Sequence, residues 1–386
     1  MRQVVTTEKI PIKLWLDDIE KGALAQAKNL ANLPFAFSHI AIMPDAHQGF
    51  GMPIGGVMAT RDVIVPNAVG VDIGCGMCAV KTSLETIAKS TLRTIVKEIK
   101  RSIPVGFRHH DKKQTEKWMP KPTAQTPVVK QHYSSALKQI GTLGGGNHFI
   151  EIQQGNDGYI WLMVHSGSRN IGYRVANYYN KLAVRLNARQ GSPIPKNRGL
   201  AFLPLDSDLG RTYQAEMEYC VGFALANRRL MMARIKEAVL AVFAQTLFGE
   251  MINIAHNYAA PEKHFGHSVM VHRKGATRAR VGQLGIIPGS QGAVSYIVKG
   301  LGNPESFESC SHGAGRKMGR KQAQRELNLA KEQKRLDAMG VIHSVYRKRD
   351  LDEAAGAYKD IASVMANQTD LVEITVELQP LAVMKG

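Results

Sequence analysis

A glycine-rich stretch, Asn67–Val80, limits what this chain can fold into more than any other part of the sequence. Within it Asp72 and Cys75 lie three residues apart, and Gly74 and Gly76 flank the cysteine. Glycine backbone permits a tight bend with both side chains on one side, and carboxylate and thiolate groups are metal ligands, so we expect a metal site. The alternative is structural: cysteine is often buried and aspartate is common in turns, which favours a strand ending in a bend beneath the core.

Composition indicates a globular protein with a polyanionic partner. The 386 residues are 44% hydrophobic, enough for a large core. Fifty Lys and Arg against 32 Asp and Glu give a net charge of +18, which favours nucleic acid as the partner over mere basic solubility. Four cysteines are too few for a disulfide scaffold, and no membrane-length apolar run or secretion signal is visible, so we expect a cytoplasmic protein.

Hydrophobic periodicity predicts a mixture of helices and strands with no repeat or clear linker. The helical pattern covers residues 16–33, 82–103, 217–248 and 354–367. Strand-like runs cover residues 36–43, 57–65, 70–80, 159–164 and 371–383. The polar segment 44–51 is predicted as a turn, and the basic segment 108–121 as an exposed loop. This loop, which contains Trp118, could bind a phosphate backbone or stack a base, but a solvated lid is the interpretation that the sequence favours.

Three histidines follow glycine-rich or strand-end turns, where side chains converge on shared sites. The histidines are His148, His165 and His256, and each of them alone would more often be a hydrogen-bonded core residue than a metal ligand. Together with Asp72 and Cys75 they are enough for two metal ions if the thiolate bridges. Ligand softness by itself favours zinc.

A fourth histidine, His312, lies in the small-residue segment Ser311–Arg316. Small neighbours allow a phosphate to approach the ring, where a neutral imidazole could attack phosphorus as a nucleophile. Arg316 or Arg320 would balance the phosphate charge, and the glycines of Gly285–Gly292 expose amides that could hold another phosphate. The alternative is a capping or core histidine.

Eight segments, in order across essentially the whole chain, resemble the RtcB-type RNA ligases: Pro44–His47, Gly70–Gly76, Gly144–Glu151, His165–Arg169, His256–Tyr258, Pro288–Ser290, Ser311–Arg316 and Lys385–Gly386. The resemblance implies an α+β fold, a single large body of mixed sheets with surrounding helices, formed by residues 1–386 as one domain. It also implies a ligase that uses GTP and manganese to join RNA 3′-phosphate or 2′,3′-cyclic phosphate ends to 5′-hydroxyl ends, in RNA repair or tRNA splicing.

The same resemblance implies a role for each matching residue. One manganese ion would be held by Asp72, Cys75 and His148, and the other by Cys75, His165 and His256. His312 would carry covalent GMP. The nucleotide would be cradled by Asn147, His148, Phe149, Ile150, Glu151, His256, Asn257, Pro288, Gly289, Ser290, Gln291, Ser295, His312, Gly313, Ala314, Gly315 and Lys385. RNA phosphates would be bound by Arg169, Lys274, Arg316 and Arg320.

Several points stay open at the level of sequence. The implied manganese replaces the zinc expectation, since nucleotide oxygens can complete the shell of a thiolate-bridged pair. Gln291 stands where many members have Met, and Asn170 where Gly is usual, which affects substrate preference or nucleotide fit rather than reaction class. A dinuclear metal phosphoesterase acting on RNA ends without guanylylation is the main alternative, and a non-catalytic RNA-binding protein is another. We expect a monomer, and the need for an archease-like activator is undecided.

Overall fold

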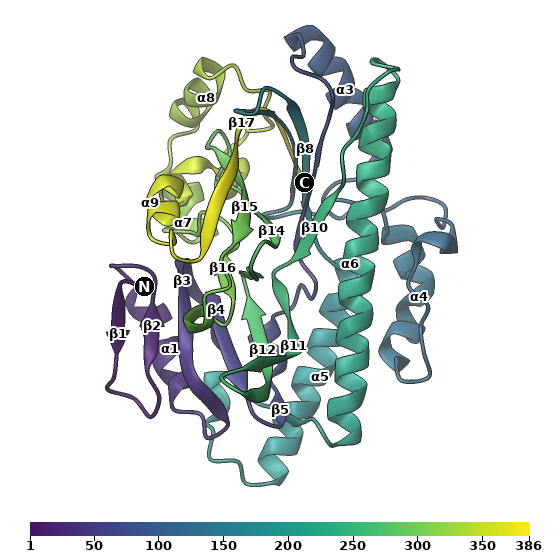
Figure 1. The fold of residues 1–386 in the computed structure, drawn as a ribbon. Helices are drawn as coiled ribbons and strands as arrows, with labels where there is room; N and C mark the ends of the chain where they lie inside the picture. Colours follow the sequence, from purple (N-terminus) through teal and green to yellow (C-terminus); the bar gives the residue numbers. More distant parts are fainter.

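The computed structural model describes all 386 residues, and most of its strands lie in two sheets (Figure 1). The first sheet has the order β1 (Gln3–Val5), β2 (Ile12–Leu14), β3 (Ala36–Phe50), β4 (Met52–Thr60), β12 (His267–Lys274) and β11 (Asn257–His264). The second has the order β10 (Ile252–Ala255), β6 (Gly76–Lys81), β8 (Ile160–Ser166), β7 (Phe149–Gly155), β17 (Val372–Lys385), β15 (Ser295–Gly300) and β14 (Leu284–Ile287). Two short ribbons pair β13 (Ala276–Arg278) with β16 (Ser309–Ser311) and β5 (Val63–Ile64) with β9 (Leu203–Pro204).

Nine α-helices surround these sheets (Figure 1). They are α1 (Lys21–Ala31), α2 (Pro66–Val69), α3 (Lys89–Ser102), α4 (Pro127–Gln139), α5 (Arg169–Arg189), α6 (Asp208–Leu240), α7 (Arg320–Glu326), α8 (Leu329–Ala338) and α9 (Ile361–Ala366). The long helix α6 packs against β8 and β6 and lies beside α5, which in turn contacts α4. None of the helices combines the length and apolar character that crossing a membrane requires. The predicted α+β class is confirmed.

Strand β3 shows how the core is divided. Successive apolar side chains point to opposite faces, so Ile40 and Ile42 pack into the cluster under α1, whereas Ala41 and Met43 pack into the cluster on the other side. The predicted turn at residues 44–51 is wrong, because the strand continues to Phe50 and pairs with β4. Register shifts along this pair re-aim the polar side chains while the backbone stays in the sheet.

Other predicted elements exist with different bounds. The helix predicted at 16–33 begins at Lys21, and the one predicted at 82–103 begins at Lys89, because Thr82 is still bridged to Phe248. Helix α6 begins earlier than its apolar pattern, at Asp208, where the Ser207 hydroxyl accepts a hydrogen bond from the Gly210 amide. Of the region predicted at 354–367, only Ile361–Ala366 is α-helical. The basic segment 108–121 is a loop with one short 3-10 turn, as predicted.

Strand β17 confirms the predicted closing strand and lies in the interior of its sheet, between β7 and β15. Its pairing with β7 places Lys385 opposite Phe149. The C-terminal end of β17 is therefore held by the sheet next to Phe149, another residue of the predicted site.

Two adjacent buried residues of α6 tie the helix to the loops around the site. Both Asn227 and Arg228 are fully buried. The Asn227 side chain accepts hydrogen bonds from the amides of Gly141 (2.6 Å) and Thr142 (3.2 Å), and donates to the Gly167 carbonyl (3.1 Å). A single amide thus holds the loops that precede His148 and follow His165.

The Arg228 guanidinium ties three further segments to the helix. It donates to the carbonyls of Gly74 (3.0 Å) and Ser166 (2.7 Å) and to the Asn253 side chain (2.8 Å). These bonds connect the glycine-rich bend, β8 and β10 to one rigid helix.

We predict that Asn227→Ala lowers the free energy of unfolding by about 3 kcal/mol, because several buried backbone groups lose their partner at once. Urea denaturation of the two proteins measures the difference. The matched control is Arg229→Ala, which alters the exposed neighbour on the same helix and should change the value by less than about 0.5 kcal/mol. Equal effects of the two substitutions would contradict this role for Asn227.

Candidate active site

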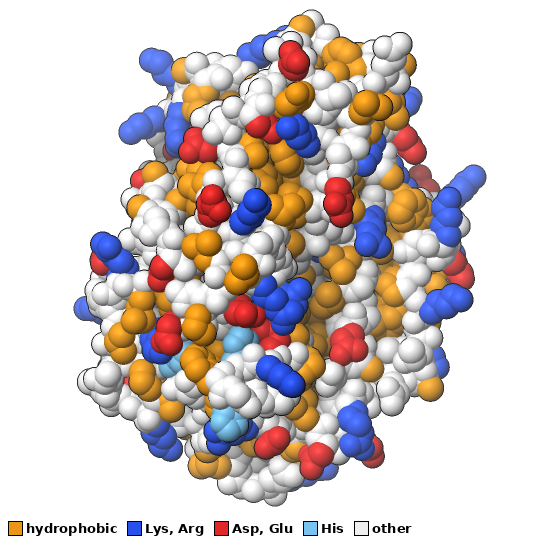
Figure 2. Space-filling model, in the orientation of Figure 1, with side chains coloured by type: hydrophobic (Ala, Val, Ile, Leu, Met, Phe, Trp, Pro, Cys, Tyr) orange, Lys and Arg blue, Asp and Glu red, His pale blue; other side chains and the backbone are white.

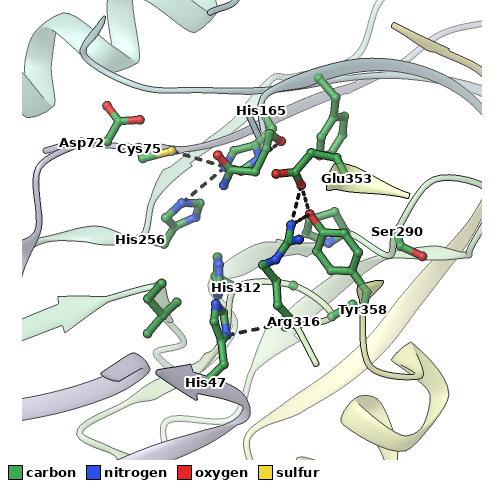
Figure 3. A pocket seen from close by; sticks show the side chains of 18 of the residues that line it. His47, Asp72, Cys75, His165, His256, Ser290, His312, Arg316, Glu353 and Tyr358 are labelled. Atoms are coloured by element: carbon green, nitrogen blue, oxygen red, sulfur yellow. Dashed lines mark hydrogen bonds and ion pairs between the residues drawn. The ribbon is translucent and has the colours of Figure 1, made fainter. Parts of the chain in front are cut away.

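A cavity of about 290 Å³ opens among the two sheets, the β13–β16 ribbon and the segments preceding α7 and α9 (Figure 3). Residues from most of the chain line it, from His47 to Lys385. The predicted residues among them are Asp72, Cys75, Asn147, Phe149, Glu151, His165, His256, Asn257, Lys274, Pro288, Gly289, Ser290, Gln291, His312, Gly313, Ala314, Gly315, Arg316, Arg320 and Lys385. The structure therefore brings together nearly all residues that the sequence singled out.

The five predicted metal ligands converge at one side of this cavity. Cys75 Sγ lies 3.4 Å from His148 Nε2 and 3.3 Å from His165 Nε2. His148 Nε2 also lies 3.0 Å from Asp72 Oδ2, and His165 Nε2 lies 3.4 Å from His256 Nε2. Cys75 consequently sits between an Asp72–His148 pair and a His165–His256 pair.

Hydrogen bonds on the far side of two rings fix which nitrogen faces the centre. His148 Nδ1 lies 2.9 Å from the Leu143 carbonyl, and His165 Nδ1 lies 3.1 Å from the Asn147 carbonyl. A carbonyl only accepts, so each Nδ1 carries the proton and each Nε2 presents a lone pair to the centre. Burial lowers the pKa of His165 and of His256 well below the ordinary value, which keeps both rings neutral.

The donor set fits a cation. Lone pairs of His148 Nε2 and Asp72 Oδ2 face each other at 3.0 Å with no proton assigned between them, an arrangement that a positive ion would relieve. Cys75, His148 and His165 have ligand atoms within 4.8 Å of one another, as a shared ion requires. His256 Nδ1 is buried without a hydrogen-bond partner, which leaves this ring less firmly oriented than the other two.

Close backbone approach explains the glycines that flank Cys75. Gly74 has a φ of +74°, and a Cβ there would lie 2.8 Å from the Cα of Val221 on α6. A Cβ on Gly76 would lie 2.0 Å from the Ile254 carbonyl oxygen. Larger residues at either position would push the bend away from α6 or β10 and move Cys75 out of the cluster.

His312 lies next to the metal-ligand cluster, with its ring centroid 4.8 Å from that of His256 (Figure 3). One carboxylate oxygen of Asp45 accepts hydrogen bonds from His312 Nδ1 (2.6 Å), from the His312 amide (3.0 Å) and from the Gly313 amide (3.2 Å). Since Nδ1 donates to Asp45, the lone pair of Nε2 is the free nucleophilic position of this ring.

Sequence reasoning assigned no role to Asp45, which the structure places in contact with His312. It is fully buried on β3, inside the segment that was predicted to be a turn. The signal was present, since an aspartate and His47 interrupt an apolar run, but nothing in the sequence showed that this strand lies beside Ser311–Arg316.

A second residue to which the sequence assigned no role, Glu353, lines the cavity and forms ion pairs with three cationic side chains (Figure 3). Its carboxylate lies 3.0 Å from Arg316, 2.8 Å from Arg320 and 3.7 Å from Lys385, and it accepts a hydrogen bond from the Tyr358 hydroxyl. Burial opposes ionisation of this carboxyl, but the charges of Lys385 and Arg316 outweigh it and hold the pKa of Glu353 below its ordinary value. Glu353 therefore stays ionised and orients three cations.

Other predicted RNA contacts are already engaged within the protein. Lys274 Nζ donates to the carbonyls of Phe50 (2.6 Å) and Asn67 (3.0 Å), and burial lowers its pKa to about 8. Arg169 lies outside the cavity lining and donates to the Gly106 carbonyl (3.2 Å). On the surface, Lys and Arg side chains are spread over the face shown in Figure 2, with Asp and Glu among them.

Three predicted nucleotide contacts support the cavity wall. The Ile150 side chain packs in the apolar cluster behind β7 and is absent from the cavity lining, to which its neighbours Phe149 and Glu151 belong. Ser295 Oγ accepts a hydrogen bond from the Gly289 amide (3.2 Å) and holds the loop before β15. Gln291 donates to the Glu353 carbonyl (2.9 Å), while its buried Oε1 has no partner.

Comparison with known proteins agrees with this arrangement. A family model described as tRNA-splicing ligase RtcB matches residues 26–386. The RNA-splicing ligase RtcB of Escherichia coli (strain K12) is 40% identical over 414 residues, covering 100% of this chain and 99% of that protein. The tRNA-splicing ligase RtcB of Thermococcus kodakarensis is 30% identical over 462 residues, covering 98% of this chain and 95% of that protein.

The cavity is also lined by Glu151, a buried acid that should make the free energy of unfolding depend on pH. Burial raises the pKa of Glu151 to about 8 from an ordinary value of 4.5, although Lys385 opposes the shift. Between these values the unfolded chain loses a proton that the folded protein keeps, so the free energy of unfolding falls as pH rises. We predict that the wild type loses roughly 1 kcal/mol per pH unit more than Glu151→Gln over this window.

Urea denaturation at about pH 5, 6, 7 and 8 tests this. Glu377→Gln removes the same charge from an exposed position on β17 and should leave the wild-type slope unchanged. Parallel pH profiles for the wild type and Glu151→Gln would show that Glu151 is ionised in the folded protein.

Proposed function

Because this chain belongs to the RtcB family of RNA ligases, we propose that it joins an RNA 3′-phosphate or 2′,3′-cyclic phosphate end to a 5′-hydroxyl end at the expense of GTP. The observation that carries the proposal is His312, whose free Nε2 faces the cavity while Asp45 holds Nδ1 at 2.6 Å. A phosphate monoester is a poor electrophile until a good leaving group is attached, which is what a covalent nucleotide step provides.

In this proposal GTP is consumed as a substrate. Nε2 of His312 attacks the α-phosphorus, so that an N–P bond forms and pyrophosphate leaves. GMP then passes to the RNA 3′-phosphate, and the 5′-hydroxyl displaces it to close the phosphodiester. A 2′,3′-cyclic end is first hydrolysed to the 3′-phosphate. Asp45 fixes the tautomer of His312 and balances the positive charge that the ring acquires on attack.

Two Mn²⁺ ions are proposed at the cluster beside His312. Asp72, Cys75 and His148 would hold one, and Cys75, His165 and His256 the other. The position of Cys75 Sγ, 3.4 Å from His148 Nε2 and 3.3 Å from His165 Nε2, supports a shared ligand. When bound, the ions would supply Lewis acidity and screen negative charge on the phosphates.

The remaining cavity residues would bind the nucleotide and the RNA phosphates. Nucleotide contacts are proposed for Asn147–Glu151, His256–Asn257, Pro288–Gln291, Ser295, His312–Gly315 and Lys385. Arg316 and Arg320 are proposed to bind phosphate, and the cavity that both line supports this. Lys274 and Arg169 would position backbone around the site unless substrate draws them from their present carbonyl partners.

We predict that wild-type protein incubated with α-³²P-labelled GTP and Mn²⁺ carries label through denaturing electrophoresis, whereas His312→Ala does not. The substitution removes the nucleophile but leaves the metal ligands, so metal content and hydrolysis of 2′,3′-cyclic phosphate ends should remain. His267→Ala, an exposed histidine at the start of β12, should be labelled like the wild type. An unlabelled wild type that still hydrolyses RNA ends would identify a dinuclear phosphoesterase instead.

We predict that Cys75→Ala reduces bound Mn²⁺ below two ions per chain and abolishes ligation, because one lost thiolate weakens both ion sites. Equilibrium dialysis with elemental analysis at micromolar Mn²⁺ measures this. Cys78→Ala is the matched control, since the Cys78 thiol is buried near the Arg228 carbonyl (3.9 Å) and outside the cavity lining. Two ions still bound to Cys75→Ala would rule out the bridging role.

A further inference from the structure

A fully exposed aromatic side chain, Phe107, lies at the tip of the loop that follows α3. Its exposed fraction is 101%, against 64% for Phe50 and Tyr346, the next most exposed aromatic residues. Single exposed apolar residues are common on protein surfaces and need no function. The surroundings of Phe107 distinguish it from those cases.

The loop is fixed on both sides of this tip. On one side, the Gly106 amide donates to the Gly144 carbonyl (2.8 Å). On the other, the His110 amide donates to the Lys138 carbonyl (3.0 Å), and the His110 ring lies 2.7 Å from the Arg234 guanidinium. Between these two anchors Phe107, Arg108 and His109 are exposed, and the Arg108 amide donates to the Val105 carbonyl (3.3 Å), so the Phe107 ring is presented from a fixed backbone.

That base is attached to the metal-ligand cluster. The Leu143 amide donates to the Pro104 carbonyl (2.9 Å), and the Leu143 carbonyl is the acceptor that orients His148. The Gly106 carbonyl accepts a hydrogen bond from Arg169 (3.2 Å). Phe107 thus directly follows Gly106, which is hydrogen-bonded to the loop that orients His148.

The charge around the tip suits RNA. Arg108, Lys112 and Lys113 are exposed in the same loop, and His109 is exposed beside them. Trp118, the other aromatic residue of this segment, is less accessible, because it is partly buried against the core cluster of α4, α5 and α6. An exposed ring with neighbouring cations is the combination that binds unpaired nucleotides, in which bases stack on aromatic faces and phosphates contact Lys and Arg.

We propose that Phe107 is a stacking platform for an unpaired nucleobase of the RNA substrate, close to the end being joined. This inference rests on the proposed RNA-ligase function and adds a base contact to the phosphate contacts named there. Stacking is tolerant of base identity, so Phe107 would add affinity for single-stranded ends without selecting a sequence.

The test compares Phe107→Ala, Phe107→Trp and Leu247→Ala, the last being a matched control that truncates another strongly exposed apolar side chain, 73% exposed, on the loop after α6. Binding to a single-stranded RNA with a 3′-phosphate is measured by fluorescence anisotropy. Stacking energies per base predict that Phe107→Ala weakens binding roughly 5- to 100-fold. Phe107→Trp and Leu247→Ala should bind like the wild type, and self-guanylylation should be equal in all four proteins.

RNAs with one abasic nucleotide at each position near the end then locate the stacked base. The wild type should lose affinity for one of these RNAs, and for that RNA the difference between wild type and Phe107→Ala should vanish. Unchanged RNA affinity of Phe107→Ala would overturn the proposal and leave Phe107 as a contact for another protein. A loss of affinity equal for all abasic RNAs would overturn it as well. Failure of the wild type to take label from GTP would instead refute the proposed function, since the binding assay does not depend on guanylylation.

Discussion

The buried guanidinium of Arg228 is the contact on which the rest of the site depends. It is an unexposed cation that binds the carbonyls of Gly74 and Ser166, one on each side of the cluster of proposed metal ligands. A buried charge is costly unless it is hydrogen-bonded and compensated, and here the carboxylate of Asp72 and the thiolate form of Cys75 would compensate it. Burial raises the pKa of the Cys75 thiol well above its ordinary value and Asp72 adds to this shift, but the charge of Arg228 opposes it. The same cation therefore favours the thiolate form that a metal ion would require of Cys75, while it fixes the backbone next to this residue.

The proposed metal ligands and His312 are held in the cavity by different parts of the fold. The metal-ligand cluster is built from the bend before β6 and from the ends of neighbouring strands of the seven-stranded sheet, and α6 holds it rigidly. His312 instead follows β16, and its partner Asp45 comes from the six-stranded sheet. The proposed nucleophile and the proposed metal ligands are thus carried by different sheets and meet at the cavity, so a change in the packing of the sheets would alter their separation.

Sequence reasoning located the site better than it located the elements that carry it. Residues such as Cys75, His165 and His312 were found because they lie in short segments rich in small residues, which can be recognised from the sequence alone. Asp45 was misplaced in a turn because local polarity was weighed, whereas pairing with β4 on either side of it, at Ile42 and His47, keeps this segment in the strand. Glu353 left no local signal at all, because its role comes from Arg316, Arg320 and Lys385, which the fold brings to it from other segments.

The interior position of β17 has a consequence for how the molecule is made. The strands on its two sides, β7 and β15, are separated by more than a hundred residues and do not pair with each other. Until residues 372–385 have been synthesised, each of those strands presents an open edge with unpaired backbone groups. The nascent chain must keep two such edges apart from the synthesis of β15 until the synthesis of β17. Aggregation of incomplete chains, rather than loss of the finished fold, is therefore the hazard that this topology creates.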